Sequence, residues 1–149
     1  MKRNALDKLQ EISSKAKDTA ARVLASEQAS AAQIQAQRDQ LKTYRDDYAH
    51  QLEAAKIEGA DMMTIHTYSA FLSSLDAAYD AALTQVAKQQ QRVVKSRESW
   101  VGAHRRATSF DALADRYDQE QSRAEARREA RLQDEFNTNV AARASLLRN

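Results

Sequence analysis

The stretch Ile57-Glu58-Gly59-Ala60-Asp61 contains one of only two glycines in a chain of 149 residues that has no proline. Gly59 can adopt the left-handed conformation that ends a helix, and Asp61 can cap a following helix by accepting hydrogen bonds from its free amides. We therefore predict a bend at residues 58–61. A phosphate-binding loop would need further glycines and a Lys-Ser or Lys-Thr pair, which this stretch lacks.

The composition on both sides of the bend favours helices. Ala, Glu, Lys, Leu and Arg make up 73 of the 149 residues, the share that is typical of long helices and coiled coils. Sheets, sandwiches and barrels need a turn about every ten residues, and two glycines without proline cannot provide these turns. The sequence therefore predicts an all-α protein.

Apolar residues before the bend recur at spacings of three and four, as on one face of a helix. Glu27, Ser30 and Gln37 interrupt this pattern, so we expect the packing to be loosest there. One predicted line consists of Leu9, Ala16, Val23 and Tyr44, and the other of Ala20, Ile34, Leu41, Tyr48 and Ala55.

The pattern after the bend is more regular and keeps one heptad register. Gly102 lies within it at a cost of about 1 kcal/mol relative to Ala, which a long packed helix can absorb. One line consists of Ile65, Leu72, Tyr79, Val86, Val93, Trp100, Ala107 and Ala114, and the other of Tyr68, Leu75, Ala82, Gln89, Ser96, Ala103, Phe110 and Tyr117.

Two helices joined by a short bend run antiparallel, and this bend pairs residues whose numbers add up to about 119. The predicted fold is a long antiparallel two-helix coiled-coil hairpin in which the second helix is longer than the first. We expect a single coiled-coil domain over residues 1–149, with a first helix at about 4–57, a second helix at about 62–144, and an unpaired charged overhang at 118–144.

The sequence offers no chemistry for catalysis. His50, His66 and His104 lack the i, i+4 partner of a helical zinc site, and there is no cysteine. The acidic residues do not lie in segments apolar enough to raise their pKa for acid–base work, and a two-helix rod has no pocket that excludes water. We expect no enzyme activity, catalytic residue, cofactor, metal or small-molecule substrate.

The charge and hydropathy of the chain limit where in the cell it is expected and which classes of partner it can bind. No apolar run approaches the length of a spanning helix, and no secretory signal follows the basic N-terminus. We therefore expect a cytosolic protein. The formal net charge of +2 is nearly balanced, which argues against nucleic acid as a partner because phosphate binding needs a concentrated positive face.

Surface for protein partners remains. Around the bend the apolar stripe is wider than a two-stranded coil can cover, so Phe71 and part of each tyrosine should stay accessible. These rings could simply seal the end of the coil. Aromatic rings partly exposed at one end of a coiled coil are also what a protein-docking patch requires.

Several segments of the chain resemble the FliJ family of the flagellar type III export apparatus, in order and spacing over nearly the whole length. The resemblance is carried by residues 41–48 (LKTYRDDY), 68–72 (YSAFL), Leu75-Asp76, Ser99-Trp100, 113–116 (LADR) and Asp134-Glu135.

The resemblance implies a cytosolic export component, similar to the central stalk of rotary ATPases, that associates peripherally with the cytoplasmic face of the membrane at the flagellar base. Its implied partners are the hexameric flagellar export ATPase, the cytoplasmic domain of the export gate and the export chaperones.

The resemblance also implies binding positions. For the ATPase ring they lie at the end that carries both termini, at Leu6, Leu9, Phe110 and Arg116. For the export gate the matching positions are Gln37, Leu41, Tyr44, Tyr48, Phe71, Leu75, Ala78 and Ala82. At Ala82 this chain departs from the larger polar residue that some relatives carry.

Two alternatives remain open from the sequence. The first is the equivalent stalk protein of a virulence-type injectisome, which shares the architecture. The second is a basic amphipathic helix that lies on a membrane or on nucleic acid, suggested by five cationic residues of the second helix: Arg92, Lys95, Arg97, Arg105 and Arg106.

Overall fold

The structure, a computed structural model, describes residues 2–148. Within this range the chain forms two helices and no strand: α1 spans Lys2–Ile57 and α2 spans Met62–Arg148. The second helix has 87 residues against 56 in the first. The predicted all-α helical hairpin with a longer second helix is thus confirmed, and the helices extend to residues 2 and 148 rather than the expected 4 and 144.

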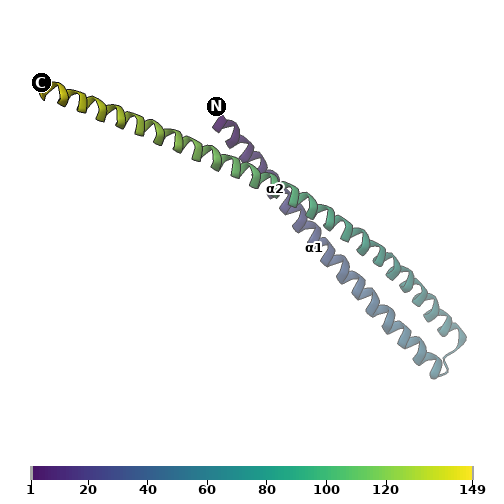
Figure 1. Ribbon diagram of the computed structural model, residues 1–149. Helices are drawn as coiled ribbons and strands as arrows, with labels where there is room; N and C mark the ends of the chain where they lie inside the picture. The colour runs from purple at the N-terminus through teal and green to yellow at the C-terminus, as the bar shows by residue number, and fades with distance from the viewer. Residues whose placement is uncertain (1, 149) are drawn as a thin grey trace. The chain divides into compact units, whose positions relative to one another are not determined.

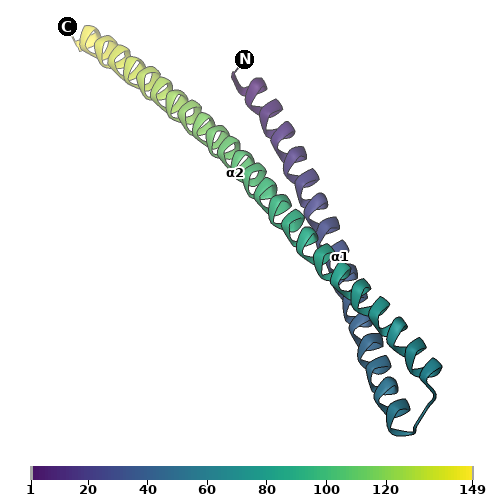
Figure 2. The same cartoon turned by 90° about the vertical axis from the view of Figure 1, so that its right-hand side faces the viewer.

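The chain packs as two units. The first combines residues 2–16 of α1 with residues 104–148 of α2, and the second consists of residues 17–103. We call them the terminal unit and the bend unit. In the bend unit, Figures 1 and 2 show both helices extending from one short loop to the same side, so that the chain runs in opposite directions along them.

The loop stops one helix and starts the next through two standard motifs. Gly59 has a φ of 76°, and its amide donates to the Lys56 carbonyl at 3.3 Å while the Ala60 amide donates to the Ala55 carbonyl at 3.0 Å. These two bonds form a Schellman motif, which satisfies carbonyls left free at a helix end. Asp61 then begins α2, because its Oδ1 accepts a hydrogen bond from the Thr64 amide at 3.0 Å.

The seam of the bend unit, meaning the side chains through which its two helices face each other, is shallow. The two lines predicted for α2 are buried or half-buried along residues 65–103, as is the predicted α1 line of Ala20, Ile34, Leu41, Tyr48 and Ala55. Among the described residues no large side chain is fully buried, since two helices alone cannot surround one. The seam therefore relies on small residues such as Ala31 and Ala82.

The other predicted line of α1 is wrong. Leu9, Val23 and Tyr44 are 40–48% exposed, whereas the less exposed positions follow a strict heptad one residue further on. The physical reason is that long cationic side chains can lie along a seam while their charged ends reach water. The observed line consists of Arg3, Gln10, Lys17, Leu24, Ala31, Arg38, Arg45 and Leu52.

A polar layer interrupts the seam of the bend unit at Gln89, which is 5% exposed. Its side-chain amide donates to the backbone carbonyl of Glu27 at 3.0 Å and also to the Glu27 carboxylate. Both bonds run between the helices, so the layer is satisfied. A buried polar pair of this kind fixes the register of two helices at some cost in stability.

The terminal unit pairs the start of α1 with part of α2. Arg3 donates to the Ala114 carbonyl at 3.2 Å and forms an ion pair with Asp118 at 3.3 Å, and Gln10 donates to Asp111 at 2.9 Å. Ala107 and Ala114 are buried. Small residues on α2 thus allow close approach, and polar side chains bridge the two helices at the edge of the contact.

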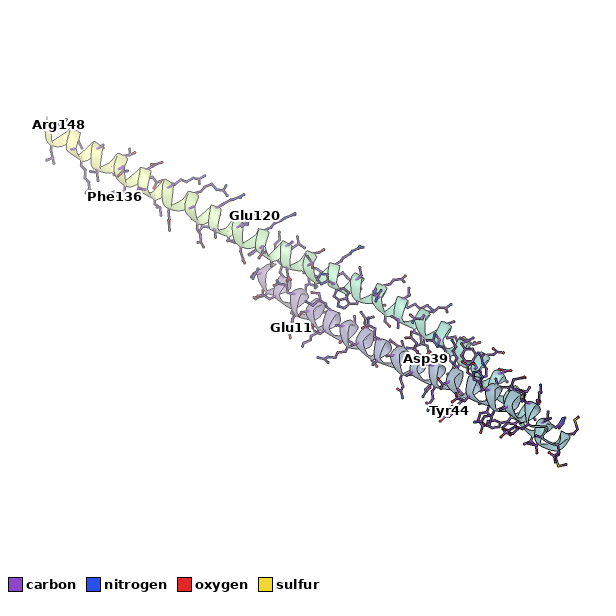
Figure 3. The ribbon with its side chains drawn as sticks, turned by 90° about the horizontal axis from the view of Figure 1, so that it is seen from below. Glu11, Asp39, Tyr44, Glu120, Phe136 and Arg148 are labelled. Carbon is purple, nitrogen blue, oxygen red and sulfur yellow. The ribbon has the colours of Figure 1, made fainter. Side chains whose placement is uncertain are left out.

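From residue 125 to 148, α2 carries only exposed side chains. Figure 3 shows Phe136 and Arg148 projecting from this stretch. Five large apolar residues lie on this exposed stretch: Leu132, Phe136, Val140, Leu146 and Leu147.

Neither helix, over the residues that the structure covers, is long and apolar enough to cross a membrane.

Candidate protein-docking site beside the bend

Three aromatic rings meet across the two helices of the bend unit, close to the loop. Tyr48 of α1 contacts Phe71 with ring centroids 4.6 Å apart and Tyr68 with centroids 6.3 Å apart, both in tilted arrangements. Tilted pairs at these distances are favoured by the ring quadrupoles. Tyr48 and Phe71 have numbers that add up to 119, the register predicted for the hairpin.

The rings form one wall of an open groove with a volume of about 510 Å³. The groove lies on residues of both helices, and its lining contains no ionisable acid or base apart from tyrosine hydroxyls. Apolar surface combined with hydroxyl and amide groups suits a contact that is apolar at its centre and hydrogen-bonded at its rim. The lining residues are Tyr48, Gln51, Met63, Thr64, Thr67, Tyr68 and Phe71.

Further apolar side chains beside the loop escaped the sequence prediction. Ile57 is 85% exposed, and Met62 and Met63 are about equally exposed at the start of α2. A pair of methionines directly after a helix stop was the available signal, because flexible thioether side chains adapt well to binding surfaces. They extend the apolar surface from the groove to the loop.

The gate positions implied by the resemblance divide into three groups in the structure. Gln37, Tyr44, Phe71 and Ala78 are exposed, and Figure 3 marks Tyr44 on α1. Leu41, Tyr48 and Leu75 are half-buried in the seam and present only an edge. Ala82 is 8% exposed and packs between the helices, so it has almost no surface to offer a partner.

The four positions implied for the ATPase ring all belong to the terminal unit. Leu9 and Arg116 are exposed, whereas Leu6 and Phe110 are half-buried between the helices. Their shared feature is their place on the paired part of the unit, next to the bonds that Arg3 and Gln10 make to α2.

Charged groups beside the groove are held in local contacts. Arg45 lies 3.7 Å from Asp76 and 3.4 Å from Asp46, and its guanidinium carbon is 4.6 Å from the centroid of the Tyr79 ring. Such partly exposed pairs contribute little to stability, and the cation–ring contact adds somewhat more. Arg45 therefore serves chiefly to cover the seam.

The pKa of the Asp61 carboxyl, beside the groove, is lowered by its role as the cap of α2. Hydrogen bonding from the Thr64 side chain and backbone amide lowers the pKa of the Asp61 carboxyl below its usual value of 3.8. Hydrogen bonds to a carboxylate favour the charged form. The cap of α2 is thus an ionised carboxylate at neutral pH.

Two further observations concern the polar side chains of the described residues. Over residues 2–148 no three His, Asp or Glu side chains come together in a way that could hold a metal ion. Every buried side-chain nitrogen or oxygen in this range has a hydrogen-bond partner, so none is left pointing toward an absent group.

Comparison with known proteins assigns the family. A family model described as "Flagellar FliJ protein" matches residues 1–146. The chain belongs to the FliJ family. As a FliJ-family chain, it is a component associated with type III protein export, as the resemblance implied.

A solved structure shares the fold of this FliJ-family chain. The structure of CT670, a YscO homolog from Chlamydia trachomatis, matches with a TM-score of 0.67 at 19% identity, over 93% of this chain and 90% of CT670. At this identity the likeness concerns the fold. A search of curated proteins found no match.

Proposed function

We propose that this FliJ-family chain is the coiled-coil stalk of a flagellar export apparatus, and that the bend unit docks on the cytoplasmic domain of the export gate. The observation that carries the proposal is the groove beside the bend, whose lining combines three aromatic rings with uncharged polar groups. Partly exposed aromatic residues in such a groove are the anchors that protein interfaces use most.

The same proposal assigns the terminal unit to the hexameric export ATPase, through Leu9 and Arg116 with support from Leu6 and Phe110. It also includes binding of export chaperones. In each case the chain acts by binding and does not catalyse a reaction. Its proposed location is the cytoplasm, with peripheral attachment to the cytoplasmic face of the membrane through the gate.

Binding of the gate domain tests the groove. Phe71 lines the groove and is 45% exposed, whereas Tyr44 is a gate position outside the lining and is 48% exposed, so Tyr44→Ala with Phe71→Ala removes contact surface while the hairpin loses only the ring contact of Phe71 with Tyr48. We expect the dissociation constant for the cognate gate domain to rise at least about tenfold, as for loss of interface anchors. Isothermal titration calorimetry measures it, and circular dichroism checks that helicity is kept.

The matched control is Leu83→Ala. Leu83 is a large residue of α2 with 40% exposure, and it lies twelve residues after Phe71, about 120° further round the helix. Leu83→Ala should leave the affinity for the gate domain unchanged. Equal affinities for the double variant and the unaltered chain would refute the groove as the gate contact.

Salt dependence provides a second readout. Because the groove lining carries no ion pair, the affinity for the gate should change little as salt is added, in contrast to a contact through basic residues on phosphate groups, which weakens steeply. A steep loss would favour the alternative of a basic helix on membrane or nucleic acid.

The injectisome stalk is the second candidate, favoured by the shared fold with a YscO homolog. The flagellar assignment is supported by the family match over residues 1–146. Deleting the gene in the native host separates the two: loss of swimming, restored by the intact chain, is expected for the flagellar stalk, and loss of effector secretion with normal swimming for the injectisome stalk.

A further inference from the structure

The exposed stretch of α2 after residue 124 carries an apolar face of its own. Leu132, Phe136, Val140 and Leu147 lie within about 80° of the helix circumference at 100° per residue. They are 49–88% exposed. We call these four residues the tail face.

The tail face does not continue the lines by which α2 packs on α1. Extended past Ala124, those lines pass through positions that hold no large apolar side chain: Arg128, Arg131, Glu135, Thr138, Ala142 and Ser145. At 100° per residue, the centre of the tail face is turned by about 135° from the centre of these lines. A helix arranged like α1 would therefore not cover it, and the face suits a different helix.

Charges beside the tail face select the direction of that helix. Glu129 and Glu135 lie before the centre of the face along the helix, and Arg143 and Arg148 lie after it; Glu129 and Arg143 fall within the arc of the face itself. A parallel second copy would set each of these charges against itself, which is unfavourable. An antiparallel copy would set acidic residues against basic ones.

We propose that the tail face binds the tail face of a second copy of this chain, antiparallel and centred near residues 139 and 140. In this register Leu132 lies opposite Leu147 of the second copy, and the two Val140 side chains meet. Glu135 comes within one turn of Arg143 of the second copy, and Glu129 comes within one turn of its Arg148. Because the antiparallel pair has twofold symmetry, each contact between different residues occurs twice.

The area of the tail face indicates a weak dimer. Four large side chains per copy are fewer than a stable interface contains, so the dimer should form at high concentration and dissociate on dilution. This proposal does not rest on the proposed function. A chain that pairs reversibly through this helix would shield the apolar face until another occupant displaces the second copy.

Sedimentation of the full chain from low micromolar to several hundred micromolar concentrations tests the proposal. We expect the average mass to rise toward that of a dimer. Leu132→Ser with Phe136→Ser should raise the dissociation constant at least about tenfold. Leu113→Ser is the control, because Leu113 is 45% exposed in the same unit but lies outside the tail face. A mass that stays monomeric throughout would overturn the proposal.

A charge exchange tests the direction. Glu135→Arg and Arg143→Glu should each weaken the dimer, whereas the double variant should restore it because both ion pairs are rebuilt with reversed signs. Both substitutions lie on an exposed stretch of helix and leave the seam intact, so helicity should not change in any of the three variants. If the double variant dimerises as weakly as expected from adding the effects of the two single variants, the antiparallel register is overturned. Disulfide cross-linking gives a second test: two copies of the Leu132→Cys variant that cross-link to each other, in place of Leu132→Cys to Leu147→Cys, would also overturn it.

Discussion

The bend unit and the stretch 125–148 of α2 both expose large apolar side chains, but they hold them in different ways. In the bend unit, Tyr48 and Phe71 contact each other across two helices, next to a loop closed by the Schellman motif and the Asp61 cap. In the stretch 125–148, Phe136 stands on a helix whose side chains are all exposed. The first surface is held in place by contacts between two helices, whereas the second depends on the helix propensity of a single helix.

The largest expected difference between the two regions is in the free energy of unfolding when one apolar residue is truncated in each. Leu52→Ala removes a side chain that is 7% exposed in the seam of the bend unit, so we expect the free energy of unfolding to fall by about 2–3 kcal/mol. Phe136→Ala should change it by less than about 0.5 kcal/mol, because Phe136 loses no packing. Urea unfolding followed by far-ultraviolet circular dichroism measures both. Similar losses would mean that Phe136 is packed in the folded chain.

Replacing the polar layer formed by Glu27 and Gln89 should instead stabilise the bend unit. Glu27→Leu with Gln89→Leu exchanges the buried Gln89 and its half-buried hydrogen-bond partner Glu27 for apolar packing, and the free energy of unfolding should rise by about 1–2 kcal/mol. The register would then be less strictly specified. Thermal unfolding gives the stability. A drop in stability would show that the pair contributes more than the apolar contacts that replace it.

Substitutions of Gly59, which ends α1, should change the free energy of unfolding by less. A Cβ added at Gly59 would meet no atom within 4 Å, so Gly59→Ala costs only the strain of its positive φ, about 1 kcal/mol. Gly59→Asn should cost less, since Asn tolerates this conformation. Chemical unfolding of the two variants compares them. A larger loss for Asn than for Ala would exclude backbone strain as the cause.

The smallest effect concerns pH at the start of α2. Because the pKa of Asp61 is lower in the folded chain than its usual 3.8, the cap contributes fully above that value and its contribution is lost as the pH falls through the folded pKa. Asp61→Asn keeps a capping oxygen that does not titrate. The stability difference between the two proteins should therefore be constant near neutral pH and change only in acid, as thermal unfolding at several pH values would show.

The sequence predicted the second helix better than the first. The lines on α2 hold from Ile65 to Tyr117 because almost every heptad position carries an apolar or small residue. On α1, a line chosen by residue type passed through Val23 and Tyr44, while the structure places Lys17 and Arg45 in the register. Residue type alone misses a position that is filled by the aliphatic part of a charged side chain.

The candidate site was predictable in its location but not in its extent. Tyr48 and Phe71 were expected near the bend, and they line the groove. Ala82 could not be placed, because an alanine fits equally well on a surface or in a seam, and the structure buries it. Ile57 and Met63 were missed because apolar residues next to a turn give no periodic signal.

The short loop also has a kinetic consequence. Contacts between the helices span ever longer stretches of chain with distance from the loop: Gln89 and Glu27 are 62 residues apart, and Arg3 and Ala114 are 111 apart. Closing such a long segment in one step is entropically costly, but pairing that starts beside Gly59 adds each new layer next to an existing one. Folding should nucleate at the loop and proceed in the manner of a zipper, so the Arg3 contacts form last and are the first to open.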